Sequence, residues 1–419
     1  MNDIRPLHVL VAGGGLAGLA VAQGMVKRGH TVEVFERDVD LNRKQGYYLH
    51  MNPFGGEALR AVLPDDLFEL YLETSRTTYR RQESIVLDDQ LRELSSQPHL
   101  GPANNGERDG GRPHTGVHRR TLRQILSTRL GDAFQAGAAV VGYAEDADGV
   151  TVTLVDGSTA RGDVLVGADG IRSAVRAQRL PDVPVIPTGI RGIGVYGRTP
   201  LTPELRALLP PVLLEGVIIA VDRAGSRLLI GTFDPRRPAD EAARELARDA
   251  ALDRVEPYVM VSCSVAPGTL VPPAAEWTAD TPAQMRDSML RAVEGWHPAA
   301  GALVGGMDLA SIFMIPFGFL DVAESWEPSR VTLVGDAAHA MLPTLGMGAN
   351  LALRDAGRLV EELSRVGRGD ADPVEAIGAY ERDMREVVYP FHRATLDHDK
   401  NFGGGALQKA AAGADTATP

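Results

Sequence analysis

The stretch that most constrains the fold is HVLVAGGGLAGLAVAQ at residues 8–23, whose glycines have the spacing G-x-G-x-x-G. The apolar run at 7–12 has the length of a strand, and residues 19–29 carry apolar side chains at helical spacing up to a glycine that can end a helix. TVEVFER at 31–37 then predicts a second strand. This strand–turn–helix–strand context is the one in which the glycine spacing indicates a dinucleotide-binding Rossmann unit.

Each glycine of the loop has a physical task. Gly13 permits the tight turn after the strand, Gly15 lets the backbone approach a pyrophosphate, and Gly18 lets the helix pack on the strand. The helix N-terminus offers free N–H groups and a partial positive charge to phosphates. Glu36, at the end of the second strand, is placed for the ribose hydroxyls of an adenosine.

The same glycine spacing recurs in GIRGIGVYGRT at 189–199, but its surroundings differ. Pro184 and Pro187 precede it in place of a long buried strand, and prolines follow where a helix would run. Glycine in an extended segment more often marks a bulge or a close approach of backbone to ligand. We therefore predict a strand of a substrate lobe here and only one Rossmann unit in the chain.

Length and composition restrict the classes of protein. The 419 residues, 44% of them hydrophobic, suit two or three domains, and the net charge of -12 includes no Lys/Arg-rich block that could follow a phosphate backbone. We expect no nucleic-acid partner. The single cysteine, Cys263, cannot form an internal disulfide or a cysteine metal site, and it is expected to be a small apolar residue on a strand.

Nothing in the sequence indicates export or a membrane. The chain enters its first strand without a basic region or a cleavage site, and apolar runs such as 216–221 fall short of the roughly 20 residues that cross a bilayer. A cytoplasmic protein is expected, with no membrane partner. The oligomeric state is left open.

Three further motifs carry a family resemblance. HRRTLRQIL at 118–126, ADGIRSAVR at 168–176 and GDAAHAMLPTLGMGANLALRDA at 335–356 follow the first glycine loop in order. Together they resemble the FAD-dependent monooxygenases of the aromatic hydroxylase type, the class A flavoproteins similar to para-hydroxybenzoate hydroxylase. The resemblance covers residues 7 to about 395.

The resemblance implies an α/β fold. A Rossmann-like FAD-binding domain with a mixed sheet and C-terminal helices would comprise residues 1–182 and 295–402. An antiparallel β-sheet domain for the substrate would be inserted at 183–294, together with part of 74–112. The Pro-rich, short apolar runs of the insert fit such a sheet, and the tail at 403–419 is expected to be flexible.

The resemblance also implies an FAD site. Arg119 would contact the diphosphate and ribityl region, Asp169 would serve FAD and NAD(P)H engagement, and the Asp336 carboxylate would bind a ribityl hydroxyl. Taken singly, these residues could be a solvated arginine, a turn residue and a helix cap, and their joint order favours the cofactor site. The predicted cofactor residues are Gly13, Gly15, Leu16, Ala17, Gly18, Glu36, Arg37, Arg43, Gly46, Arg119, Asp169, Gly170, Gly335, Asp336, Pro343, Gly346, Gly348, Ala349 and Asn350.

A second glycine-rich corner suits a flavin. A helix beginning at Gly348 would direct N–H groups and a positive dipole end at whatever lies in front of it. The resemblance implies that this is the edge of the isoalloxazine that becomes anionic on reduction. Met347 stands where the family often has Gln, and Arg354 where it often has Glu, so the local ion pairing is expected to differ. His339 is expected to be mainly structural.

In the family, NADPH or NADH reduces the flavin, O2 adds to form a C4a-hydroperoxide, and one oxygen atom passes to an electron-rich substrate. The cofactor carries the difficult chemistry, so no nucleophile or metal site is required, and we assign no catalytic acid or base. A hydrophobic, aromatic or polycyclic small molecule is the expected substrate. The candidate substrate contacts are Tyr48, His50, Arg191, Tyr196, Phe313 and Phe317.

Other functions remain open at this point. A flavoenzyme of the same fold could perform Baeyer–Villiger oxidation, epoxidation or O2-independent reduction, and a non-catalytic flavin-binding module is a further class. A flavin halogenase is disfavoured because the W-x-W-x-I-P signature does not occur.

Overall fold

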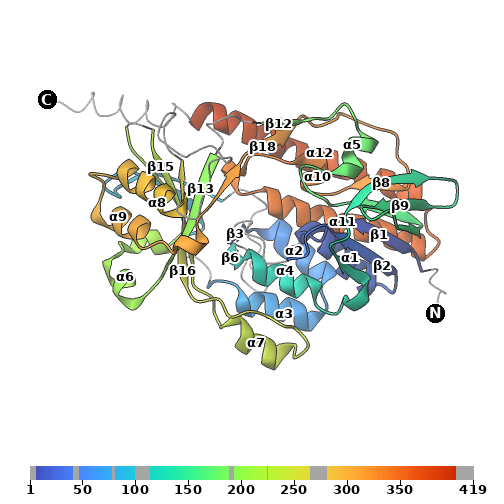
Figure 1. The fold of residues 1–419 in the computed structure, drawn as a ribbon, viewed down its shortest axis with the longest axis horizontal. Helices are drawn as coiled ribbons and strands as arrows, with labels where there is room; N and C mark the ends of the chain where they lie inside the picture. The colour runs from blue at the N-terminus through green and yellow to red at the C-terminus, as the bar shows by residue number, and fades with distance from the viewer. Residues whose placement is uncertain are drawn as a thin grey trace.

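The structure is a computed structural model of the 419-residue chain (Figure 1). It describes residues 6–40, 47–77, 81–99, 114–187, 193–223, 225–264 and 281–402. Arg43, Gly46, Arg191 and the tail at 403–419 therefore lie outside the described residues.

A five-stranded parallel sheet forms the centre of one lobe. Its strand order is β19-β11-β1-β2-β7, and every neighbouring pair is parallel. The strands are β1 (His8–Ala12), β2 (Thr31–Glu36), β7 (Phe134–Ala136), β11 (Val164–Gly167) and β19 (Val331–Leu333). The continuous apolar runs of β1, β11 and β19 are typical of strands covered on both faces.

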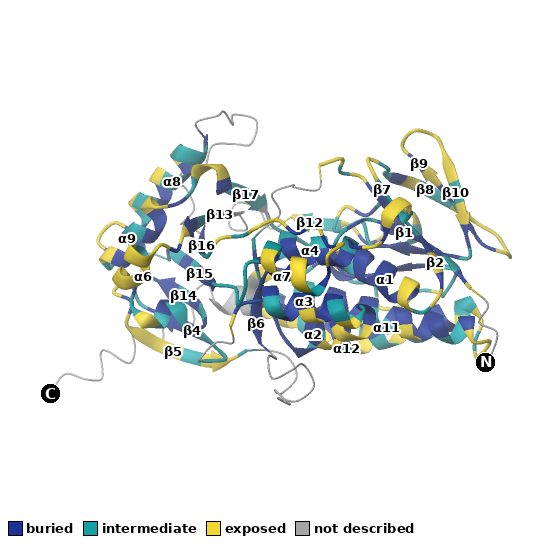
Figure 2. Cartoon of the chain, turned by 90° about the horizontal axis from the view of Figure 1, so that it is seen from below, coloured by how far each residue is buried: buried dark blue, intermediate teal, exposed yellow. Residues whose placement is uncertain are grey.

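Helices pack against one another beside this sheet. Helix α1 (Leu16–Lys27) ends just before Gly29, whose φ is +82°, as the sequence predicts. It packs on α11 (Gly348–Gly367), which also contacts α2 (Pro53–Val62) and α12 (Pro373–Phe402) (Figure 2). None of the helices in the described ranges has an apolar stretch long enough to span a bilayer.

The remaining helices and strands complete the two lobes. The helices are α3 (Asp65–Thr74), α4 (Arg119–Ser127), α5 (Ala174–Arg179), α6 (Pro203–Leu208), α7 (Ala239–Leu246), α8 (Thr281–Ala292), α9 (Pro298–Gly305) and α10 (Asp336–His339). A three-stranded sheet contains β8 (Val140–Glu145), β9 (Val150–Leu154) and β10 (Thr159–Gly162), with Gly157 at φ +86° in the turn between β9 and β10. Two short pairs are β3 (Tyr48–Met51) with β6 (Thr115–His118) and β12 (Val185–Pro187) with β18 (Gly318–Leu320).

The second lobe is built on a seven-stranded sheet of order β17-β13-β16-β15-β14-β4-β5. Its strands are β4 (Glu83–Leu87), β5 (Glu93–Pro98), β13 (Ile193–Pro200), β14 (Val217–Val221), β15 (Arg227–Phe233), β16 (Tyr258–Ser264) and β17 (Phe313–Pro316). The predicted α/β fold class is confirmed, with two differences. The sheet of the FAD-binding domain, predicted to be mixed, is wholly parallel. The second sheet, predicted to be antiparallel, is mixed because β14 and β4 are parallel. The long connection between β4 and β14 permits this parallel pair, which a short hairpin could not form.

One face of the seven-stranded sheet is covered by α8 and α9. Val195, Val261 and Ile230 point into the apolar core on that side, as does Cys263, which is buried on β16 as predicted. The alternating residues face the other way, towards the β3–β6 ribbon. There the ring of Tyr48 lies close to two strand glycines, Gly116 and Gly231, where a side chain would collide with it.

Gly194 and Gly197 of the second glycine match lie within strand β13, as predicted, and Gly192 lies outside the described residues. Ile193–Pro200 pairs with β16 on one side and β17 on the other. A helix, α6, begins only after the strand has ended, at Pro203, where the sequence analysis expected prolines to prevent one. Gly197 is required by packing, because a Cβ there would lie 2.7 Å from the sulfur of Met307.

Candidate cofactor and substrate site

The β1–α1 loop has the shape that its glycines predict. Gly13 adopts φ +106°, and a Cβ on Gly13 would collide with the backbone of Ala168 on the neighbouring β11 side. A Cβ on Gly18 would collide with the carbonyl of Gly13. Gly15 differs, since nothing lies within 4 Å of the position its Cβ would take. The loop is therefore tightly packed at Gly13 and Gly18 and has free space at Gly15.

This difference gives a test of what lies in front of the loop. Gly15 has an extended conformation with φ -77° that valine tolerates, so Gly15→Val should leave the fold intact. We expect it to weaken FAD binding by at least about tenfold, because the new methyl groups occupy the space that a pyrophosphate needs. Fluorescence titration of the apoprotein with FAD measures the change. Gly301→Val, in open space on α9, is the matched control and should leave the affinity unchanged.

Glu36 is held in place by three hydrogen-bond donors. Its Oε2 accepts from the backbone N–H of Gly14 and from the Arg123 guanidinium, both at 2.9 Å, while Oε1 accepts from the Asp38 N–H at 2.8 Å. Arg123 also donates to the Gly14 carbonyl at 2.8 Å. The sequence analysis missed Arg123, although its position four residues after Arg119 on α4 puts it near the same helix face.

The predicted arginines near this end differ in exposure. Arg119 is the first residue of α4, is half-buried, and donates its backbone N–H to the Tyr47 carbonyl at 2.7 Å. The Arg37 side chain is 62% exposed and pairs with Asp38. In the first turn of α1, Leu16 is buried and Ala17 half-buried. Contacts of Arg119 and Arg37 with a cofactor stay predictions.

Asp169 caps a helix, whereas the ordinary role that the sequence analysis allowed for it was that of a turn residue. Its Oδ2 accepts from the N–H of Ala174 at 2.7 Å, at the start of α5. Burial raises the pKa of this carboxyl, and hydrogen bonds from Ser173 and backbone N–H groups oppose the rise. Its Oδ1 is buried with no partner in the described part of the chain, and Gly170 beside it has φ +78°. The cap therefore leaves one acceptor atom unused.

Three segments converge at Gly335. Gly335 has φ +59°, and a Cβ there would lie 2.8 Å from that of Ala352 on α11 and 3.5 Å from that of Ala17 on α1. Asp336 follows as the first residue of α10 and is exposed. An exposed carboxylate thus stands where the heads of α1 and α11 meet.

A buried ion pair supports the turn that carries Asp336. The Asp355 Oδ2 lies 2.5 Å from the Nε2 of His339 and accepts from the Gly335 N–H at 3.2 Å. Both side chains are fully buried. Burial disfavours the imidazolium, but the Asp355 carboxylate outweighs this effect and the pKa of His339 is raised. This geometry favours the structural role predicted for His339.

At the N-terminus of α11, Gly346 and Gly348 have free space around them, while the side chain of Asn350 is fixed by hydrogen bonds. The predicted start at Gly348 is confirmed. Gly346, at φ +64°, has no atom within 4 Å of its Cβ position, and Gly348 has only Met341 at 3.8 Å. Asn350 is buried; its Oδ1 accepts from the Asn52 N–H and its Nδ2 donates to the His50 carbonyl, both at 2.8 Å. Asn350 therefore fastens α11 to strand β3.

The two positions that depart from the family pattern point away from this open backbone. Met347 is buried, with its sulfur 3.4 Å from the Asn52 amide nitrogen. Arg354 forms an ion pair with Asp383 of α12 at 2.7 Å. Of the other corner residues, Ala349 is half-buried and Pro343, which opens a one-turn 3-10 helix (Pro343–Leu345), is exposed.

Aromatic rings gather where β13, β17 and the β3 end meet. Tyr196 stacks on Phe313 with ring centroids 5.4 Å apart, and Phe313 contacts Tyr47 edge-on at the same distance. The sequence analysis missed Tyr47, because only the fold brings it to this group. Tyr196, Phe313 and the nearby Phe317 are all half-buried.

The other two described candidates are more enclosed. Tyr48 is packed between strands and is 9% exposed, which favours a structural role. The His50 Nε2 lies 3.1 Å from the Nδ1 of His114. Substrate contacts of Tyr48 and His50 stay predictions.

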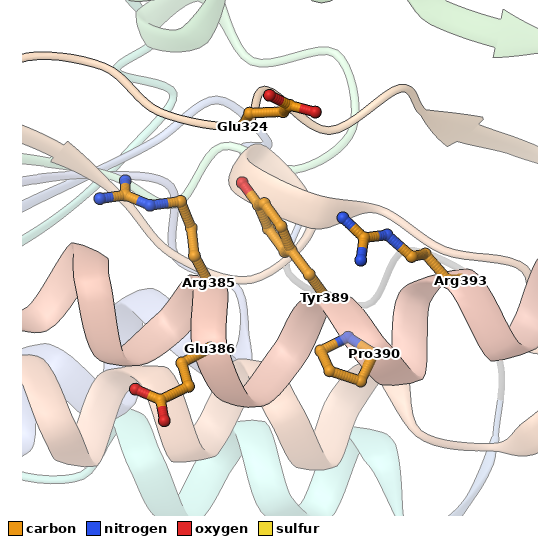
Figure 3. A pocket seen from close by; sticks show the side chains of 6 residues that line it. All are labelled: Glu324, Arg385, Glu386, Tyr389, Pro390 and Arg393. Carbon is orange, nitrogen blue, oxygen red and sulfur yellow. The ribbon is translucent and has the colours of Figure 1, made fainter.

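An open pocket of about 410 Å³ lies elsewhere, on the outer side of α12 (Figure 3). Arg385, Tyr389 and Arg393 project from one side of the helix, and Glu324 lies across from them. The pocket shares no residue with the predicted cofactor set. Its two arginines are accompanied by two glutamates, Glu324 and Glu386, so its charges cancel.

The described residues fit an FAD molecule. The backbone is open at Gly15, Gly346 and Gly348, and the exposed Asp336 stands beside these segments. Two helix N-termini, those of α1 and α11, offer N–H groups to phosphate and to an anionic ring. The arrangement can therefore bind an elongated dinucleotide along the edge of the parallel sheet.

Known proteins agree with this geometry. A family described as an FAD binding domain matches residues 320–394. The chain is 32% identical over 401 residues to a dual O-methyltransferase/FAD-dependent monooxygenase of Cercospora beticola, covering 91% of this chain and 44% of that protein. It is 29% identical over 407 residues to a chloroplastic zeaxanthin epoxidase of Nicotiana plumbaginifolia, covering 93% and 54%. The chain thus spans about half the length of these curated relatives.

Solved structures share the fold. A provisionally described FAD-containing monooxygenase of Photorhabdus luminescens superposes with a TM-score of 0.78 at 29% identity, covering 94% of this chain and 98% of that one. Klebsiella pneumoniae HpxO, crystallised with FAD and uric acid, has a TM-score of 0.72 at 22% identity, covering 97% and 91%. The second likeness concerns the fold alone.

Proposed function

We propose that this chain, like the relatives it resembles, is an FAD-dependent monooxygenase, and that it uses FAD, NADPH or NADH, and O2 to hydroxylate a small hydrophobic molecule that is aromatic or polycyclic. The observation that carries the proposal is the meeting of the α1 loop, the Asp336 turn and the head of α11. We also propose the division into an FAD domain and an inserted substrate domain of 183–294 with part of 74–112. Since α9 and β17 belong to the second lobe, the substrate domain extends to Pro316 and the FAD domain resumes after it and not at 295.

In this proposal each segment holds a different part of the cofactor. The open backbone at Gly15 and the head of α1 receive the pyrophosphate, while Glu36, fixed by Arg123, receives the adenosine ribose. Asp336 accepts a hydrogen bond from a ribityl hydroxyl. The head of α11 at Gly348 directs N–H groups at the isoalloxazine.

FAD, when bound, supplies the electron transfer and the activation of oxygen. The chain supplies binding, orientation and exclusion of water. Asn350 contributes by hydrogen bonding α11 to β3. These bonds fix the position of β3, which lies beside the flavin in this proposal, relative to the N-terminus of α11. No described side chain needs to act as a nucleophile.

The substrate class is supported by one row of residues across the seven-stranded sheet. The strand registers place Phe313, Tyr196, Ser262, Leu229, Ile219 and Val86 side by side, on the face opposite to the α8–α9 core. Phe313, Tyr196, Leu229 and Ile219 are only half-buried, and the row contains no charged residue. A flat, apolar molecule suits such a surface.

Leu229 lies in the middle of this row and gives a test of it. Leu229→Trp is expected to raise the Kd for the substrate, or for an aromatic ligand such as 2-naphthol, by about tenfold or more, because the indole fills the space above the sheet. FAD affinity should not change. Perturbation of the flavin absorbance by the ligand measures the effect, with Val141→Trp on the exposed side of β8 as the control.

The experiment that tests the function follows NAD(P)H oxidation with a panel of aromatic compounds, in air and without O2, with 18O2 as the tracer. Substrate-dependent oxidation that places one labelled oxygen atom in the product supports the proposal. Turnover that persists without O2 would indicate a reductase, and FAD binding without any turnover would indicate a flavin-binding module.

Epoxidation is the second candidate. The 29% identity to zeaxanthin epoxidase extends over 93% of the chain, so the same site could add oxygen to an isolated carbon–carbon double bond. Labelled product from an alkene in place of an arene would favour this reaction.

A further inference from the structure

Three histidines form a compact cluster beside the head of α11. His50 lies on β3, His99 follows β5 and His114 precedes β6, so the three come from separate segments. Their ring centroids are 4.2 Å (His50–His99), 5.3 Å (His50–His114) and 5.2 Å (His99–His114) apart. The chain thus concentrates three of its ten histidines at one point.

The cluster joins the two lobes. On one side, the Nδ1 of His99 lies 3.3 Å from the hydroxyl of Ser84 on β4, within the seven-stranded sheet. On the other side, the His50 carbonyl accepts a hydrogen bond from the buried Asn350 amide at the head of α11. Movement of His50 away from its neighbours would therefore pull on the contact that fastens β3 to α11.

The packing favours neutral imidazoles. Burial lowers the pKa of His99 and of His114 to about 4, and burial together with the other two rings holds the pKa of His50 well below its usual value. Among the described residues, the titratable groups that shift the pKa of His50 and of His99 are other histidines of the cluster. The uncharged Ser84 and Asn350 hydrogen-bond to His99 and to the His50 carbonyl.

We infer that the His50–His99–His114 cluster is a positioning device for Asn350: neutral, it holds β3 against both the substrate sheet and α11, and protonated, it releases β3 and loosens the flavin side of the site. Protons enter from solvent onto the imidazole nitrogens, and each added charge repels the next. A hydrogen-bonded histidine cluster with two states is a known form of acid-sensitive switch.

The size of the effect follows from linkage. Above pH 6.5 the histidines are neutral whether β3 is held or released, so the held state is not penalised. As pH falls from about 6.5 towards about 4, the released state takes up protons that the held state excludes. The population of the held state therefore decreases relative to that of the released state. At pH 5 the ratio of released to held molecules rises by about thirtyfold for each of His99 and His114.

The experiment uses the full chain with FAD and compares the parent with a His50→Gln/His99→Gln/His114→Gln variant, which keeps polar side chains of similar size that do not titrate. Hydrogen exchange of the peptides covering residues 47–52 and 83–87, corrected for intrinsic rates, is measured at pH 8 and pH 5, alongside the Kd for FAD. In the parent we expect at least tenfold faster exchange and at least tenfold weaker FAD binding at pH 5. In the variant both ratios should fall below about threefold.

His8→Gln is the matched control, since His8 is a half-exposed histidine on β1 paired with Glu33, and it should keep the parent's pH dependence. Equal exchange at both pH values in the parent, or an unchanged pH dependence in the triple variant, would overturn the inference. The flavin readout rests on the proposed function, but the exchange readout does not. Acid release of β3 in a protein that binds no FAD would therefore sink the proposed function and leave the cluster's role standing.

Discussion

Asp355→Ala is expected to lower the free energy of unfolding by about 3–5 kcal/mol, because it leaves a buried histidine without the carboxylate that it faces. The Asp355 and His339 side chains are fully buried and lie 2.5 Å apart. The substitution also removes the acceptor for the Gly335 N–H, so the turn before Asp336 loses its support. Urea unfolding at pH 7, followed by circular dichroism, measures the loss.

The pH dependence of the loss identifies its cause. Because the folded pKa of His339 is raised, the stability contributed by the charged pair is complete below the unfolded value near 6.5 and declines as pH rises through the folded pKa. The difference between parent and variant should therefore shrink in alkali. A His339→Leu/Asp355→Leu variant, which removes both charges, should be less destabilised than Asp355→Ala. A loss below about 1 kcal/mol for Asp355→Ala would contradict the buried ion pair.

Asp336→Ala is expected to weaken FAD binding by about 10- to 150-fold while leaving the stability of the apoprotein unchanged. The first effect follows from the loss of a hydrogen bond to a charged group, which contributes about 1.5–3 kcal/mol. The second follows from the exposure of Asp336 and its position at the start of the four-residue helix α10. Fluorescence titration with FAD and thermal unfolding of the apoprotein are the two measurements.

Asp132→Ala is the control for Asp336→Ala, because Asp132 is equally exposed and belongs to none of the predicted cofactor segments. It should leave both measurements at the parent's values. An Asp336→Ala protein that binds FAD as tightly as the parent would contradict the assignment of Asp336 to a ribityl hydroxyl. The Gly15→Val result would then decide whether the pyrophosphate site at the α1 loop is correct.

Local sequence predicted those parts of the site that depend on backbone. The turn at Gly13, the helix start at Gly348 and the strand over IGVYG each follow from glycine placement and apolar spacing within about fifteen residues, and all three are confirmed. The family resemblance supplied the cofactor, and the comparisons with FAD-dependent monooxygenases confirm it.

Contacts between segments that are distant in the sequence could not be predicted from local sequence patterns. The support of Glu36 by Arg123 joins residues 87 positions apart, and the clamp of Asn350 on Asn52 joins residues 298 apart. Hydrophobic periodicity carries no signal for such polar pairs, because it describes only which face of an element is buried. The aromatic contact of Tyr47 with Phe313 and the histidine cluster were missed for the same reason.

The parallel pairing of β14 with β4 bears on how this protein is made. The seven-stranded sheet needs strands from residues 83–98, 193–264 and 313–316, while the parallel sheet needs β19 at 331–333 beside β11. Neither sheet can be completed from a continuous stretch of chain. During synthesis the seven-stranded sheet lacks its edge strand β17, and the parallel sheet lacks its edge strand β19, until about three quarters of this chain has been made. Long-range closure of this kind is slow and leaves strand edges open to wrong partners. The interleaving that joins the two lobes makes the nascent chain dependent on protection from aggregation until β19 is in place.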